Sequence, residues 1–325
     1  MAQQVSDVRY PGYLRDLVVD YKIDKLIAPM VLPQLGVANL TGVYYEFSRA
    51  EALSVPETLS TAGGYAKEDV LTSSQMPFAL EKHHRRHFLA QTLIDNQDDV
   101  VGLEERISRR LWQRLMLRYE QDVASMVFKA ANYSASNKIA LAGNDQWSSD
   151  LSDPFEQIET ARAACIREPN TIIIGGDVWP YVKKHSKFID RVKGGATTML
   201  PAKFYEMVAS EMFEVENVFV GKQRYNSTPK KATATYSYLW SDMVVLAYIN
   251  PESTIDDVTF GNTLIYTPSA SSSRMAEVQG VEGGARIRKY EEPAKGEGFW
   301  LEVEQYRKPT IVSADCGYCI YDVLA

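Results

Sequence analysis

The sequence is poor in the residues on which most catalytic and metal sites depend. Its 325 residues include only three cysteines and four histidines. Three cysteines are too few for a disulfide scaffold in a chain of this length, which fits synthesis in a reducing compartment. The sequence has no GxSxG or HExxH motif, and no carboxylate pair has a distinctive spacing. We therefore expect no catalytic residue, no metal site, no cofactor and no enzymatic activity.

Long apolar runs are absent as well. No stretch of about 18 apolar residues occurs, so we expect no transmembrane helix and no membrane partner. The N-terminal sequence also lacks the apolar centre of a signal peptide. Apolar residues make up 45% of the chain and charged residues 24%, which are ordinary values for a globular protein. The formal net charge of -7 argues against a chain that is basic on every face, but it allows a local basic patch.

Two short motifs resemble functional sites but lack essential parts. Cys316 and Cys319 have the CxxC spacing of redox and zinc sites, yet no second CxxC exists and a strand pattern follows them. We predict buried structural thiols there. Gly175 and Gly176 follow a predicted strand, as in a phosphate-binding loop, but the GxGxxG and GK[S/T] patterns are missing. An α/β enzyme that uses Gly175, Gly176 and Asp177 is therefore only a minor alternative.

Proline is absent between Pro77 and Pro154, and a long helix is predicted in this interval. From Asp98 to Ala131 apolar residues recur every three or four positions, which is the spacing of one helix face. At 1.5 Å per residue such a helix is on the order of 50 Å long. A second row on this helix is basic, and its arginines repel one another because they are spaced at i,i+4. The row therefore indicates either a surface that binds a partner or a solvated face whose charge is balanced by acids from elsewhere in the fold. The row consists of Arg106, Arg109, Arg110, Arg114 and Arg118.

A polar segment separates two predicted strands before this helix. Val43, Tyr45 and Phe47 alternate with polar neighbours, and apolar character resumes at Met76 and continues to Leu89. The segment between them is long for a loop in a compact domain, and an isolated two-stranded hairpin is marginal in water. We therefore expect a projecting hairpin that rests on another subunit, which implies self-association.

Three of the four histidines belong to one basic cluster, from His83 to His87. His83 and His87 would share a helix face as metal ligands, but five basic groups would repel a cation and Glu81 is the only nearby acid. We interpret the cluster as a basic strand at a contact surface. The fourth histidine, His185, lies in a lysine-rich run that predicts a surface position. The candidate subunit-interface residues are Arg49, Glu51, Lys67, Glu68, His83, His84, Arg85, Arg86 and His87.

Beyond the long helix, helices and strands alternate. A helix over Pro154–Arg167, a buried strand over Thr171–Ile174, a helix at about 201–210 and strands near 218–221 and 244–249 predict an α/β unit at about 153–272. Further on, a basic strand at 286–290 and an acidic strand at 299–304 flank a turn, so charge pairs favour their antiparallel match. Residues 316–324 form the last predicted strand.

This order of arm, hairpin, long helix, α/β unit and terminal strands resembles the major capsid protein of tailed bacteriophages. Local similarity is best in Thr171–Trp179, Phe213–Gly221 and Leu239–Tyr248. The resemblance implies an α+β, Hong Kong 97-like capsid fold. Its parts would be an N-terminal arm at 1–42, an E-loop at 43–92, a P-domain with the spine helix at 93–152, an A-domain at 153–272, P-domain strands at 273–310, and a C-terminal strand at 311–325 that could return to the A-domain.

The resemblance also implies a function and partners. The chain would be a virion protein that assembles in the host cytoplasm into an icosahedral head shell around double-stranded DNA. Its partners would be other copies of itself in pentamers and hexamers, a portal and, in some members of the family, a decoration protein. A separate scaffolding protein is implied because the arm shows no heptad run. The arginine row would face either packaged DNA, without sequence specificity, or a neighbouring subunit. An encapsulin-type nanocompartment shell protein, with the same fold, is the alternative.

Overall fold

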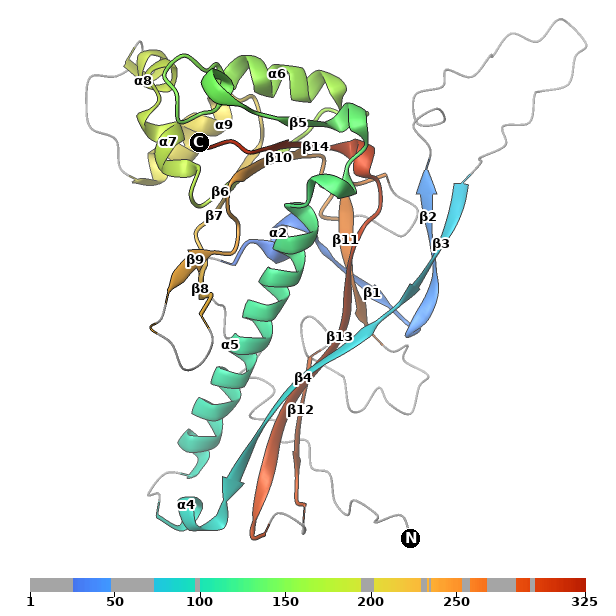
Figure 1. The fold of residues 1–325 in the computed structure, drawn as a ribbon. Coiled ribbons are helices and arrows are strands. Elements are labelled where there is room, and N and C mark those ends of the chain that lie inside the picture. The colour runs from blue at the N-terminus through green and yellow to red at the C-terminus, as the bar shows by residue number, and fades with distance from the viewer. Residues whose placement is uncertain are drawn as a thin grey trace, which may run out of the picture.

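The computed structural model describes most of the chain, and Figure 1 shows its arrangement. The described residues are 26–47, 73–96, 100–193, 202–228, 233, 235–252, 258–267, 285–292 and 296–325. Most of the predicted arm lies outside these ranges, as do four of the predicted interface residues, namely Arg49, Glu51, Lys67 and Glu68. Within the described ranges, no helix is both long enough and apolar enough to cross a membrane.

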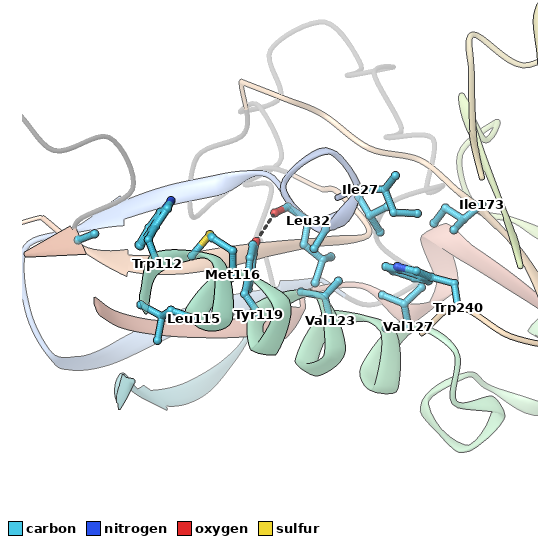
Figure 2. Close-up of a cluster of buried hydrophobic side chains, with 14 of the residues drawn as sticks. Ile27, Leu32, Trp112, Leu115, Met116, Tyr119, Val123, Val127, Ile173 and Trp240 are labelled. Carbon is cyan, nitrogen blue, oxygen red and sulfur yellow. Dashed lines mark hydrogen bonds between the residues drawn. The ribbon is translucent and has the colours of Figure 1, made fainter. Parts of the chain in front are cut away.

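One long helix, α5 (Val100–Val127), contacts both of the larger sheets. Its 28 residues confirm the long helix that the sequence predicts between Asp98 and Ala131. It ends earlier than predicted, because a short 3-10 turn follows at Ala130–Asn132. Figure 2 shows that its apolar face collects side chains from the start of the described chain and from the second sheet. These buried residues include Ile27, Leu32, Leu115, Tyr119, Val123, Val127, Ile173 and Trp240.

The first sheet is organised around one strand of 14 residues. Its strands are β1 (Gln34–Val37), β4 (Glu81–Ala90), β11 (Gly261–Tyr266), β12 (Ala285–Tyr290) and β13 (Gly298–Ile311). The long strand β13 pairs with β4 along one edge and with β12 and β11 along the other, antiparallel in each case. The predicted antiparallel match of the basic strand with the acidic strand is therefore confirmed.

The strand β11 belongs to this first sheet and not to the α/β unit at 153–272, where its place in the sequence predicted it. It pairs in parallel with β1 and antiparallel with β13. A hydrophobic pattern identifies a strand but not its partners, because those partners lie far away in the sequence. The α/β unit therefore ends before β11.

The second sheet has the strand order β5-β14-β10-β6-β7. Along β6, Ile172 and Ile174 face the aromatic core beneath the helices, whereas Ile173 faces the cluster on α5, as strand alternation requires. The strand β5 lies in the segment 93–152 that the resemblance assigns to the P-domain, but it pairs with β14 of this sheet. The strands of this second sheet and the helices in the same part of the chain are β5 (Lys138–Ala140), α6 (Pro154–Ala164), β6 (Thr171–Gly175), α7 (Trp179–Lys184), α8 (Ser186–Lys193), α9 (Ala202–Met212), β7 (Asn217–Gly221), β10 (Met243–Ala247) and β14 (Gly317–Tyr321).

Two smaller ribbons and two short helices complete the described structure. The strands β2 (Thr41–Phe47) and β3 (Ser73–Ala79) form an antiparallel pair that extends away from α5 in Figure 1. The other elements are β8 (Arg224–Asn226), β9 (Tyr236–Tyr238), α2 (Ala28–Val31) and α4 (Gln91–Asp95).

The carboxylate of Glu120 joins three parts of the chain inside the core. It accepts hydrogen bonds from the backbone N–H of Ile27 (3.0 Å), the backbone N–H of Ala28 (2.9 Å) and the indole N–H of Trp240 (2.6 Å). The residue is fully buried. Burial raises the pKa of Glu120, and the three hydrogen bonds oppose that rise without cancelling it. One side chain of α5 thus fixes both the start of α2 and the loop before β10.

The two motifs that resemble functional sites serve packing in the structure. Cys316 and Cys319 are free and fully buried, and burial raises the pKa of Cys319 to about 12, which confirms the prediction of buried thiols. A Cβ atom on Gly175 would lie 1.6 Å from the carbonyl oxygen of Ser241, and the backbone N–H of Gly176 donates to the carbonyl oxygen of Trp240 at 2.8 Å, so this N–H group is not available to a phosphate. The glycine pair is therefore not a phosphate cradle.

Candidate functional site

The predicted basic strand is β4, and its alternating side chains form two different surfaces. Lys82, His84 and Arg86 lie on the face of the first sheet that points away from α5. His83, Arg85 and His87 share the opposite face with Leu89, which is buried in the α5 cluster. The structure therefore divides the predicted cluster between two environments.

The face away from α5 carries a ladder of ion pairs across three strands. Glu304 of β13 lies 2.6 Å from Lys82 of β4 and 2.6 Å from Arg288 of β12. Glu302 lies 2.7 Å from His84 and 3.3 Å from Arg288. The expectation that Glu81 is the only acid near the cluster was wrong, because the cross-strand partners are more than 200 residues away.

The third basic residue of this face has aromatic partners. The Arg86 guanidinium lies 4.3 Å from the centre of the Trp300 ring, and it donates a hydrogen bond to the Tyr290 hydroxyl at 3.3 Å. All three basic side chains that β4 contributes to this face are therefore engaged within the subunit. These contacts stabilise the sheet, because cation–π and ion-pair contacts gain strength where neighbouring acids are withdrawn from water.

We expect the ladder to make stability fall in acid. Burial alone would raise the pKa of Glu302, but the hydrogen bond with His84 and the charges of Arg288 and Lys82 outweigh it and lower this pKa below its ordinary 4.5. A carboxyl group with a lowered pKa stabilises the fold above its unfolded-state pKa, and this contribution disappears as the pH falls through the folded-state value. At pH 7, Glu302→Gln should lower the free energy of unfolding by about 1–3 kcal/mol.

Urea unfolding of the two proteins between pH 7 and pH 3 checks this expectation. The difference between wild type and Glu302→Gln should narrow as the pH drops below 4.5, because the carboxyl is then protonated first in the unfolded chain and, at its lowered pKa, finally in the folded protein. Glu297→Gln, at an exposed acid on the turn before β13, is the matched control and should show no such difference. A constant gap across the whole pH range would show that the loss at Glu302 comes from packing and not from charge.

The face of β4 toward α5 brings His83 of the predicted basic strand near Arg118 of the predicted arginine row. Burial lowers the pKa of His83, and the charges of Arg307 and Arg118 lower it further, against the opposite effect of Asp122 and Glu81. Because β4 leads through the short helix α4 back into α5, the two elements run in opposite directions (Figure 1). His83 therefore lies toward Arg118, and His87 lies toward the start of the helix.

The arginines of α5 differ in their partners. Arg106 donates to the carbonyl oxygen of Gly102 at 3.1 Å, and Arg118 lies 2.8 Å from Asp122. Arg109 lies 4.0 Å from Glu105. In the described part of the chain, Arg110 and Arg114 contact no acid and make no hydrogen bond through their side chains. The acids that pair with Arg109 and Arg118 lie on α5 itself and not elsewhere in the fold, so both interpretations of the row stay predictions.

The β2–β3 ribbon exposes apolar side chains on both of its faces. Val43 is 43% exposed and Met76 is 38% exposed. Val43 pairs with Pro77, and Met76 pairs with Tyr44, so Val43 and Met76 point to opposite faces. On the face that carries Met76, Phe78 packs with Val37 and Leu264, and Tyr44 packs against the same cluster. Val43 and Met76 themselves remain exposed, one on each face of the ribbon.

Several structurally important polar residues were not predicted from the sequence. Glu120 lies between Met116 and Val123 on the apolar face of α5. A carboxylate at this position in the sequence could have indicated a buried and hydrogen-bonded acid. Arg307 is fully buried, donates to the Gln305 side chain at 2.7 Å and to the Leu115 carbonyl oxygen at 3.3 Å, and has its pKa lowered to about 10 by burial.

The predicted surface position of His185 is also wrong. His185 is only 3% exposed, and its Nε2 atom lies 3.0 Å from the Ser152 hydroxyl. It is buried because it lies between α7 and α8, whose Val182 and Phe188 pack into the core of the second sheet. Among the described residues, no group of three or more His, Cys, Asp and Glu side chains could hold a metal ion.

Comparison of sequences gives relatives that are phage major capsid proteins. The chain is 26% identical over 278 residues to the major capsid protein of Pseudomonas phage JBD67, which covers 85% of this chain and 89% of that protein. It is 27% identical over 159 residues to the major capsid protein of Burkholderia phage BcepMu, covering 48% and 49% of the two chains. The crystal structure of a phage-related protein from Bordetella bronchiseptica RB50 superposes with a TM-score of 0.74 at 21% identity, covering 98% and 99%.

The family model for phage major capsid protein E matches residues 119–306. This match begins in the last third of α5 and includes the second sheet except β14, together with β11, β12 and most of β13 of the first sheet. It therefore joins parts of both large sheets in one family pattern. The chain belongs to the phage major capsid protein E family, and it has the α+β, Hong Kong 97-type capsid fold.

Proposed function

We propose that many copies of this chain assemble, as pentamers and hexamers, into an icosahedral head shell that encloses the double-stranded DNA of a tailed phage. The β2–β3 ribbon is the observation that carries this proposal. Phe78 and Tyr44 pack within the subunit, whereas Val43 and Met76 are exposed on opposite faces of the ribbon. A two-stranded ribbon needs further packing for stability in water. A neighbouring copy would supply that packing at every position of a closed shell.

The sheet arrangement supports an assignment of the parts. The β2–β3 ribbon would be the E-loop, α5 with the first sheet the P-domain, and the second sheet with α6 to α9 the A-domain. This division moves β11 to the P-domain and β5 to the A-domain, as their pairing favours. Assembly in the host cytoplasm with a separate scaffolding protein, a portal and a decoration protein remains a prediction from the family resemblance.

The proposal gives the chain a structural role and no catalytic one. The enzyme alternative depended on Gly175 and Gly176, whose surroundings are filled by backbone. The encapsulin alternative shares the fold, but the matching family model and the named relatives are phage capsid proteins. DNA in purified particles, as opposed to a protein cargo, would separate the phage shell from a nanocompartment.

Charges placed on the ribbon should block assembly without unfolding the subunit. The double variant Val43→Asp, Met76→Asp should abolish shells, because each burial site would lose about 1–2 kcal/mol of apolar contact and would gain a desolvated carboxylate. A loss above 1.4 kcal/mol per contact lowers association more than tenfold. Negative-stain electron microscopy, with scaffold present, measures shell yield, and circular dichroism checks folding.

The matched control places the same charges on exposed apolar residues of the second-sheet region. Leu151 is 74% exposed and Met207 is 51% exposed, so Leu151→Asp, Met207→Asp should leave the shell yield within about twofold. Normal shells from the ribbon variant would contradict the role given to the ribbon. A wild-type chain that forms no particles with scaffold at high concentration would contradict the proposed function itself.

A further inference from the structure

The β8–β9 ribbon pairs with no other strand of the described chain, and it projects below β6 and β7 in Figure 1. Its register runs from Arg224 opposite Tyr238 to Asn226 opposite Tyr236. Arg224 and Tyr236 share one face of the ribbon, because opposed residues point to the same side and every second pair returns to it. Tyr236 is 68% exposed, and Arg224 is exposed as well. This face is therefore open to a partner.

The segment that forms this ribbon carries charge of one sign. Between Glu216 and Asp242 the sequence has no acidic residue and four basic residues, of which Lys222 and Arg224 belong to the described chain. The Arg224 guanidinium lies 4.6 Å from the centre of the Tyr238 ring and donates to its hydroxyl at 2.6 Å. No described acid forms an ion pair with Arg224. In a chain with a net charge of -7, such a basic and aromatic ribbon favours an acidic partner surface.

A groove of the opposite character lies beside α6, and we call it the α6 groove. Its volume is about 300 Å³. This is at the small end of the range for ligand pockets, so it suits a single side chain. Phe155 of α6 and Phe213, which follows α9, contribute to its apolar lining. The lining also includes four acidic residues and one basic residue, and three of the acids are Glu156, Glu159 and Glu214.

The acids at this groove exceed the cations that pair with them. One guanidinium, that of Arg162, is shared by the carboxylates of three residues at 3.0, 2.5 and 2.9 Å, namely Glu159, Glu168 and Glu214. Glu156 forms no ion pair with a described residue. Asp153 has its own partner, since Lys187 lies 2.6 Å away. The groove therefore keeps negative charge that a cation from outside the subunit would neutralise.

The β8–β9 ribbon and the α6 groove of one subunit cannot meet. Glu214 precedes β7 and Arg224 follows it, so the two lie beyond opposite ends of one strand. Four steps of about 3.3 Å make β7 roughly 13 Å long, and its pairing with β6 fixes this separation. Figure 1 likewise places α6 and the ribbon on opposite sides of the second sheet. Complementary patches in such places join copies head to tail, and this kind of contact forms a ring when the rotation closes.

We propose that the β8–β9 ribbon of one copy docks into the α6 groove of the next copy, with Tyr236 entering the groove and Arg224 facing its glutamates. The occupant of the groove is thus a second copy of this chain. The inference rests on the proposed function, because the contact would link successive subunits within a pentamer or hexamer. Tyrosine and arginine are the residue types that anchor protein interfaces, which favours a protein partner over a nucleic acid.

Disulfide trapping tests this contact in assembled shells. In Tyr236→Cys, Glu156→Cys each copy has one cysteine on the ribbon and one at the groove, so a mild oxidant should join successive subunits. A denaturing gel without reductant should show a ladder that ends at the chain numbers of the pentamer and the hexamer. Cys316 and Cys319 are buried and should not interfere. The control Lys129→Cys, Glu156→Cys moves the first cysteine to an exposed site after α5 and should give no ladder.

Shells that give no ladder overturn the inference and leave the proposed function intact. Covalent dimers from Tyr236→Cys alone also overturn it, because ribbon would then meet ribbon. A wild-type chain that forms no shells counts against the proposed function instead.

A charge reversal tests the same contact without cysteines. Arg224→Glu should lower the shell yield more than about tenfold, and Arg224→Glu, Glu156→Arg should restore at least about half of it, because opposite charges face each other again. Lys184→Glu changes an exposed lysine of α7 and should leave the yield within about twofold. An unchanged yield in Arg224→Glu, or a failed rescue, overturns the inference. Normal Arg224→Glu shells that hold less DNA also overturn it, since they would identify the ribbon as a nucleic-acid surface.

Discussion

Replacing Glu120 by alanine is expected to lower the free energy of unfolding by about 3–6 kcal/mol. Three buried donors, the N–H groups of Ile27 and Ala28 and the indole N–H of Trp240, would lose this acceptor at once. Each unsatisfied buried donor costs about 1–3 kcal/mol. Such a loss is a large part of the stability of an ordinary domain, so most of the variant protein should be insoluble or unfolded at about 37 °C. Urea unfolding and soluble yield measure the effect.

Two further variants separate the hydrogen bonds from the helix position. Gln121→Ala changes the next residue, which is exposed, and should shift stability by no more than about 0.5 kcal/mol. Glu120→Gln keeps one acceptor oxygen but turns an amide N–H₂ toward a donor. Its loss of free energy of unfolding should therefore lie between those of Glu120→Ala and Gln121→Ala. If Glu120→Ala unfolded at the same urea concentration as Gln121→Ala, the carboxylate would not be what joins α2, α5 and the Trp240 loop.

Periodic features of the sequence predicted the framework of the fold. The spacing of apolar residues from Val100 onward revealed α5, because helix formation depends on residues three and four positions apart. The alternation at Val43 to Phe47 and the return of apolar residues at Met76 revealed the ribbon for the same local reason. Opposite charges on 286–290 and 299–304 even predicted the match of β12 with β13, since a short turn joins them.

Contacts between residues that are far apart in the sequence could not be predicted from such local patterns. Glu120 meets Ile27 across 93 positions and Trp240 across 120, and His84 meets Glu302 across 218. No local rule links these residues, so the acids that face the basic strand were missed. For the same reason β11 was placed in the wrong unit. The proximity of His83 to Arg118 needed both kinds of information, because the two basic runs were visible in the sequence while their proximity required the fold.

Gly175→Ala is expected to destabilise the second sheet by about 4 kcal/mol or more. The added Cβ would lie 1.6 Å from the carbonyl oxygen and 2.7 Å from the carbonyl carbon of Ser241. Backbone atoms cannot turn aside as a side chain can, so β6 would have to move. β6 pairs with β10 on one side and β7 on the other, and a shift would therefore disturb both neighbours. Overpacking at such a fixed site lies at the upper end of measured losses.

Thermal unfolding of Gly175→Ala and Gly143→Ala, measured side by side, separates the clash with the Ser241 backbone from the general effect of adding a methyl group. Gly143 has a φ of +60°, and a Cβ atom there would meet nothing within 4 Å, so its variant should lose only about 1–2 kcal/mol to left-handed backbone strain. A Gly175→Ala protein as stable as Gly143→Ala would contradict the close contact at Gly175, whereas a collapsed second sheet would identify this glycine as the point where β6 and the Ser241 backbone meet.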